Sequence, residues 1–149
     1  MKQNRITLFA VSLLCLAALL LSACGAADSG PVTLTVNGLV NKELQLTDSA
    51  LHKMSAVTLT LEHPKNGPTE YTGVRVNDIL NEAGIKDGAV TVTLTASDGF
   101  SADLDLATIQ TCTDCLVTFD SATAGVYNAA MAGQSSKSWV KQLITITVK

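Results

Sequence analysis

The sequence predicts an α+β domain rich in antiparallel β-structure, and three observations point to it. Apolar residues and threonines alternate along several short segments, which is the pattern of a strand with one buried face. Two or three short segments between these strands have helical spacing with helix-start or helix-stop residues. A doubly wound parallel sheet would need continuous apolar strands joined by long helices, and the chain has neither.

The first predicted elements follow a short segment of small residues. The segment 32–36 alternates apolar residues with threonine, and 44–46 is a second short strand. Residues 47–49, Thr-Asp-Ser, are typical of a helix start, and they predict a brief helix with Leu51 and Met54 on its inner side.

The middle of the chain predicts a strand, a turn, a strand and a helix. Alternation returns at 57–61, and the turn-rich stretch 63–68 separates it from the short strand 71–74. Apolar residues at helical spacing predict a helix over 76–83, with Gly84 as its stop.

The rest of the chain predicts mainly strands. The segment 90–95 alternates again and is closed by a turn at 97–100, and residues 104–106 continue into a short helix near 107–110. Three further strands are predicted at 116–119, around 126–131 and at 143–148. The threonines on the exposed strand faces suit β-structure without adding charge.

The N-terminus has the features of an export signal. Lys2 and Arg5 precede an apolar run over 6–21 that is short for a bilayer-spanning helix. The run ends in Leu-Ser-Ala-Cys-Gly at 21–25, which resembles the lipobox of bacterial lipoproteins. That resemblance implies cleavage before Cys24 and acylation of its thiol. An ordinary secretory signal and an uncleaved anchor helix are the alternatives.

This interpretation divides the chain into three parts. Residues 1–23 are the predicted lipoprotein signal peptide, 24–31 the lipidated tether and 32–149 one domain of ordinary size. The expected location is extracytoplasmic, lipid-anchored to the bacterial cell membrane. Several acyl chains make detachment slow, because each buried methylene adds roughly 0.8 kcal/mol.

Charge excludes some partners of the predicted mature chain. The whole chain has 10 basic and 13 acidic residues, and removal of Lys2 and Arg5 leaves 8 basic residues, a net charge of −5. Nucleic acid is therefore not an expected partner, since phosphate neutralisation supplies most of that affinity. Electrostatic adhesion to anionic lipid is disfavoured for the same reason.

Cys112 and Cys115 are the cysteines left after the signal peptide and Cys24 are set aside. An oxidising compartment favours a disulfide between them. A redox-active dithiol and half of a zinc site are the alternatives. Zinc would need two further ligands of suitable type. A thioredoxin-like dithiol would sit at a helix N-terminus, whereas this motif precedes a predicted strand.

Four stretches in order resemble the motifs of the oxidoreductase molybdopterin-binding domain, the fold of sulfite oxidase and its relatives. They are LTVNGLV at 34–40, YTGVRVNDILNEAG at 71–84, ASDGFSA at 96–102 and SKSWVK at 136–141. The resemblance covers nearly all of the chain from Leu34 to Val148. It implies a compact α+β domain rich in β-structure, which agrees with the strand pattern.

The resemblance also implies molybdopterin as the cofactor of catalytic members, in which a cysteine after the strand at 57–62 supplies a thiolate to molybdenum. Here that place holds His63, followed by Pro64 and Lys65. Basic side chains for the pterin phosphate are few. We interpret the chain as a ligand- or partner-binding, or redox-accessory, relative. A molybdopterin-dependent oxidoreductase and a thiol–disulfide protein using Cys112 and Cys115 remain the alternatives.

Five residues are the candidate binding residues, for a small anionic ligand or a protein partner: His63, Lys65, Arg75, Lys137 and Trp139. A histidine suits a ligand or a general base, and a guanidinium suits an anion. The plainer alternatives are a solvated loop histidine, a surface ion pair for Arg75 and a core position for Trp139. No metal site and no serine–histidine–acid order is predicted.

Overall fold

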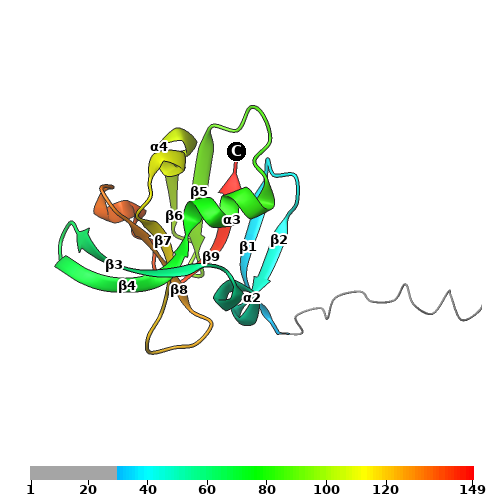
Figure 1. Ribbon diagram of the computed structural model, residues 1–149. Coiled ribbons are helices and arrows are strands. Elements are labelled where there is room, and N and C mark those ends of the chain that lie inside the picture. The colour runs from blue at the N-terminus through cyan, green and yellow to red at the C-terminus, as the bar shows by residue number, and fades with distance from the viewer. Residues whose placement is uncertain (1–29) are drawn as a thin grey trace, which may run out of the picture.

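A computed structural model describes residues 30–149, which form two β-sheets around a common apolar core (Figure 1). The predicted signal peptide, Cys24 and all but the last two residues of the predicted tether lie outside these residues. Within 30–149, no helix has the length and apolar character needed to cross a membrane.

The larger sheet has five strands in the order β2-β1-β9-β5-β6. Neighbouring strands are antiparallel except β1 and β9, which pair in parallel with Thr35 opposite Thr145. The strands are β1 (Val32–Gly38), β2 (Leu44–Thr47), β5 (Thr91–Ala96), β6 (Ser101–Asp105) and β9 (Leu143–Val148).

The smaller sheet has four antiparallel strands in the order β3-β4-β7-β8. They are β3 (Ala56–His63), β4 (Gly67–Arg75), β7 (Cys115–Phe119) and β8 (Tyr127–Met131). β4 pairs with β7 only through its last three residues, whereas it pairs with β3 along nearly its whole length. The outer part of the β3–β4 hairpin is therefore a two-stranded arm, and it curves away toward the left of the view (Figure 1).

Short helices connect the strands, and capping side chains begin two of them. They are α2 (Asp48–Lys53), α3 (Val76–Ala83), α4 (Leu106–Thr111) and the 3₁₀ turn η2 (Ser136–Ser138). The Thr47 hydroxyl accepts the Ala50 N–H at the start of α2, and Asp105 accepts the Ala107 N–H at the start of α4. α3 ends at Gly84, whose φ of +68° suits glycine.

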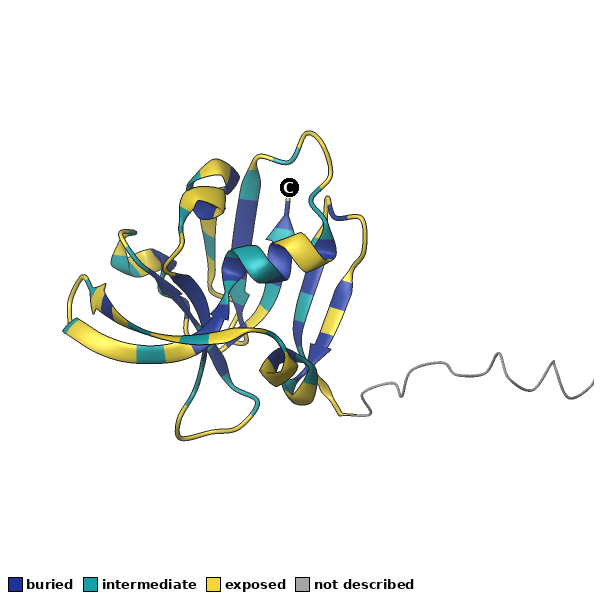
Figure 2. Cartoon of the chain, viewed as in Figure 1, coloured by how far each residue is buried: buried dark blue, intermediate teal, exposed yellow. Residues whose placement is uncertain are grey.

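The apolar residues of the alternating strands and of α3 build the core (Figure 2). Leu34, Leu94 and Ile146 are each 0% exposed on the inner face of the five-stranded sheet. α3 lies over this sheet and buries Val76, Ile79, Leu80 and Ala83. Inward burial of a leucine or isoleucine contributes roughly 1.5–3 kcal/mol relative to exposure.

The predicted α+β fold class is confirmed, and every predicted strand and helix is present within a few residues of its predicted bounds. Three features differ from the sequence-based prediction. β1 and β9 are parallel neighbours, residues 101–105 form a full strand, and η2 was not predicted. Alternation identifies a strand, but the partner of that strand depends on contacts far away in sequence.

Candidate functional site

A small hollow lies where the β3–β4 arm meets the connection from β8 to β9. Its volume is about 110 Å³. The hollow is lined by His63, Asn66, Tyr71, Asn128, Ala129, Trp139, Val140 and Lys141. We call it the His63–Trp139 pocket.

His63 ends β3, and its ring orientation is set by the turn that follows. The backbone N–H groups of Lys65 and Asn66 both donate to His63 Nδ1, at 3.1 and 3.2 Å. Because Nδ1 accepts both, the hydrogen of the neutral ring lies on Nε2. The other nitrogen of His63 is therefore a hydrogen-bond donor.

Trp139 follows η2 and packs between the arm and the body. Its ring centroid lies 4.7 Å from that of His63, nearly edge-on, and 5.6 Å from that of Tyr71. The indole Nε1 is buried and has no hydrogen-bond partner, the one such side-chain atom among residues 30–149. An unsatisfied buried donor costs about 1–3 kcal/mol, so an acceptor placed there would be favourable.

The structure brings together only some of the predicted binding residues. His63 and Trp139 meet in the pocket, and Lys65 lies in the adjoining turn with an exposed side chain. Lys137 lines a different surface hollow, with Phe100 and Asp103.

Arg75 lies at the opposite end of β4 from the pocket. Eight residue steps separate it from Gly67, which pairs with His63, and at about 3.3 Å per residue they span roughly 26 Å. Its Nε donates to the Thr113 carbonyl at 2.9 Å, inside the Cys-x-x-Cys segment. Arg75 therefore holds the disulfide loop and does not contribute to the pocket.

Four polar lining residues of the pocket were not among the candidate binding residues: Asn66, Tyr71, Asn128 and Lys141. Tyr71 was visible only as part of the YTGV motif. Asn66 lies in the turn-rich stretch 63–68 and Lys141 ends the SKSWVK motif, but neither pattern marks a pocket residue. Asn128 and Lys141 come to the pocket through the pairing of β8 with β7 and the bond from Ala129 N to Val140 O.

The predicted disulfide between Cys112 and Cys115 is confirmed, with the two Cα atoms 5.6 Å apart. Cys112 is the C-cap residue that follows α4, and Cys115 begins β7, where it is 0% exposed. Asn77 reinforces this connection by donating to the carbonyls of Gln110 and Cys112. A buried sulfur that precedes a strand suits a structural link rather than a reactive thiol.

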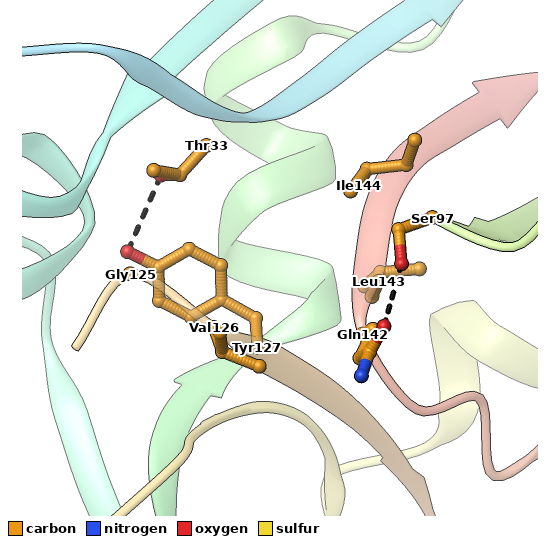
Figure 3. A pocket seen from close by; sticks show the side chains of 8 residues that line it. All are labelled: Thr33, Ser97, Gly125, Val126, Tyr127, Gln142, Leu143 and Ile144. Carbon is orange, nitrogen blue, oxygen red and sulfur yellow. Dashed lines mark hydrogen bonds between the residues drawn. The ribbon is translucent and has the colours of Figure 1, made fainter. Parts of the chain in front are cut away.

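A second hollow, of about 220 Å³, opens between β1, the loop before β8 and the start of β9 (Figure 3). Its tyrosine, Tyr127, is buried and donates to the Asp48 carboxylate at 2.5 Å, while Thr33 donates to the same hydroxyl at 3.3 Å. Burial, together with Asp48, raises the pKa of Tyr127 to about 12.

The polar groups of this second hollow already pair with one another. Figure 3 shows Ser97 bonded to Gln142, at 2.7 Å, as well as the Thr33–Tyr127 contact. The raised pKa keeps Tyr127 neutral at physiological pH, and its hydroxyl proton is already donated to Asp48. The His63–Trp139 pocket, with its unsatisfied donor, is the stronger candidate site.

Comparison with known proteins gives one family and one fold. The family described as oxidoreductase molybdopterin binding domain matches residues 25–122. Among solved structures, the sulfane dehydrogenase SoxCD from Paracoccus pantotrophus is similar over 77% of this chain, with a TM-score of 0.66 and 18% identity. The match spans 37% of that protein's chain. No curated protein sequence matches significantly.

Proposed function

The chain belongs to the oxidoreductase molybdopterin-binding domain family, and we propose that it is a lipid-anchored extracytoplasmic member that binds a small ligand rich in hydrogen-bond acceptors. The observation that carries the proposal is the His63–Trp139 pocket, one of whose lining residues, Trp139, has a buried indole N–H without a hydrogen-bond partner. The match to SoxCD supports the sulfite-oxidase-like fold. It gives no basis for assigning the activity of SoxCD to this chain.

The residues of the His63–Trp139 pocket do not fit a family-type molybdenum centre. The family resemblance puts His63 at the place of the cysteine of catalytic members, and its Nδ1 already accepts two backbone N–H groups. Within residues 30–149, the two cysteines are joined to each other, and no group of three potential metal ligands is found. A pocket of about 110 Å³ is also small beside typical cofactor sites of roughly 300–1,000 Å³.

Several lining residues of the pocket carry hydrogen-bond donors. Trp139 Nε1–H and His63 Nε2–H are both donors, and Lys141 adds a cationic ammonium at the rim. The side-chain Oδ1 of Asn128 already accepts the Gln142 N–H at 2.9 Å. This balance favours a small anion, such as a carboxylate or an oxyanion, and disfavours a cation.

Titration of the single tryptophan tests this proposal. Trp139 is the only tryptophan of the chain, so its fluorescence reports directly on the pocket. We expect a saturable change with at least one of acetate, phosphate and sulfate at constant ionic strength. Lys141→Ala should weaken it about tenfold, because one charge-assisted bond is lost. Lys137→Ala, an exposed lysine outside the pocket, is the matched control.

Two results would contradict the proposal. One is a fluorescence that none of the three anions changes in a saturable way. The other is stoichiometric molybdenum in protein produced by a host able to make the cofactor, which would favour the oxidoreductase alternative.

The proposed location rests on Cys24 and gains support from the disulfide, since such bonds persist in oxidising compartments. Mass spectrometry of the N-terminal peptide from the membrane fraction should find acyl groups on Cys24. Cys24→Ala should release the protein from that fraction or leave it uncleaved. An unmodified Cys24 in membrane-bound protein would overturn the lipid anchor while leaving the ligand site untouched.

A further inference from the structure

We propose that the free edge of β4 binds an extended basic segment of a partner protein, which adds a strand to the smaller sheet. This surface is separate from the ligand proposed for the His63–Trp139 pocket, although the two share Tyr71 and Asn128 as lining residues.

The edge is free because β7 leaves β4 early. The last pair between these strands is Gly73 with Thr118. From Thr69 to Thr72, β4 has β3 on one side and no strand of the described chain on the other. In an antiparallel strand every second residue directs its N–H and C=O to the same side, so this stretch presents unpaired backbone groups.

The free edge faces a groove of about 430 Å³ rather than open solvent. Thr69–Thr72 form one wall, and the end of β7 with the following loop forms the other. The second wall consists of Thr118, Phe119, Asp120, Ser121 and Asn128. A groove beside an open strand edge lets the backbone of a peptide supply affinity while the walls select its side chains.

The charges of the groove select the class of peptide. Glu70 and Asp120 are its ionisable side chains other than Tyr71, and no basic residue lines it. The N–H groups of Ala122 and Thr123 both donate to Asp120, at 2.9 Å. These bonds lower the pKa of Asp120, so the carboxylate is charged at neutral pH. A lysine or arginine of the added strand would pair with these carboxylates.

A second copy of this chain is a poor occupant. Among the nine described strands, the one arginine or lysine is Arg75, and it is already bonded to Thr113. The other described strands lie inside their sheets or are short edge strands. The long edge strand β3 contains an acidic residue, Glu62. A segment from another protein with alternating basic residues fits the groove better.

Fluorescence anisotropy on the full-length chain tests the proposal. The probe is a fluorescein-labelled seven-residue peptide that alternates valine and lysine, and the control peptide has glutamate in place of lysine. We expect saturable binding of the lysine peptide only. Glu70→Lys should weaken it about tenfold. Glu62→Lys makes the same charge change on exposed β3, outside the groove, and should leave the affinity within about twofold.

Backbone methylation distinguishes strand addition from simple charge attraction. Two versions of the lysine peptide are N-methylated on alternate residues, one in each frame. One frame removes the N–H groups that face β4 and should abolish binding, whereas the other should bind as before.

The proposal is overturned if both frames bind equally, or if Glu62→Lys weakens binding as much as Glu70→Lys. It is also overturned if sedimentation shows that the chain occupies this edge by self-association, with Glu70→Lys dissociating the oligomer. Lys141→Ala should leave peptide binding unchanged, which separates this surface from the ligand pocket.

Discussion

The five-stranded sheet and the β3–β4 arm have nearly the same sequence pattern but opposite degrees of burial. VTLTV at 32–36 belongs to the sheet, and VTLTL at 57–61 belongs to the arm. Leu34 and Val36 are 0% exposed, whereas Val57 and Leu59 are only half-buried. The same alternation therefore yields a core strand where a sheet and α3 cover its apolar face, and a partly solvated ribbon where they do not.

The difference places both proposed binding surfaces on the arm. A ribbon of two strands is marginally stable by itself, and here it depends on Trp139, which packs against Leu61 and Tyr71. Ligand-linked movement requires the least free energy in regions of low local stability. The well-covered sheet supplies the rigid base.

The largest expected effect separates the two regions directly. Leu94→Ala in the sheet should lower the free energy of unfolding by about 3 kcal/mol, because it leaves a cavity in a fully covered core. Leu59→Ala removes the same atoms from the arm and should cost less than about 1 kcal/mol. Urea unfolding of both variants measures the two losses of unfolding free energy. Equal losses would contradict the difference in burial between the sheet and the arm.

The seam between the two sheets should respond to alkaline pH. Tyr127 of β8 bonds Asp48 and Thr33, so it ties the smaller sheet to α2 and β1. Its folded pKa of about 12 exceeds the ordinary value of 10.0, so the folded state holds the proton more tightly. The resulting stabilisation is complete below pH 10 and is lost as the pH rises toward 12, by roughly 2–3 kcal/mol in total.

Tyr127→Phe removes this dependence. Urea unfolding at pH 8, 10 and 11.5 should show the wild-type advantage shrinking with pH, while lysine titration affects both proteins alike. A constant difference between the two proteins would mean that Tyr127 does not titrate as described.

The disulfide should stabilise the body of the domain by a smaller amount. Replacement of Cys112 and Cys115 by alanine opens a loop of four residues, for which chain entropy predicts a loss of about 2 kcal/mol. Amide exchange should rise around α4 and the start of β7, and remain unchanged in the outer arm. A rise spread equally over the arm would show that the two regions unfold together.

Trp139→Phe should change global stability least. The smaller ring loses contacts with the arm, but the change also removes the unsatisfied indole N–H, so the net cost should stay below about 1 kcal/mol. Amide exchange in the outer arm should nevertheless accelerate about tenfold, with β5 and β9 unaffected. Phe100→Leu, at an exposed aromatic residue outside the arm, is the control.

Much of the fold was predictable from sequence because it depends on local patterns. Thr47 at the start of α2 and Gly84 at the end of α3 act through bonds or angles within a few residues. The parallel pairing of β1 with β9 was not predictable in this way, since it joins residues about 110 positions apart.

The residues of the candidate site were likewise predictable only where local sequence features mark them. His63 and Trp139 stand out by residue type, and the Cys-x-x-Cys spacing indicated its disulfide. Arg75, the one guanidinium of residues 32–149, is chemically suited to the same site, yet β4 carries it to the far end of the hairpin. Which chemically suitable residues meet is decided by strand direction and register, and residue type carries no information on either.

The parallel pairing of β1 with β9 also has a mechanical consequence. Val32 begins the first strand and Lys149 follows the last, so the two ends of the folded chain leave this pair at opposite ends. A pull between the termini shears all the hydrogen bonds between β1 and β9 at once, instead of opening them one after another. A domain held at its N-terminus and loaded at its C-terminus should therefore resist extension far better than its modest size suggests.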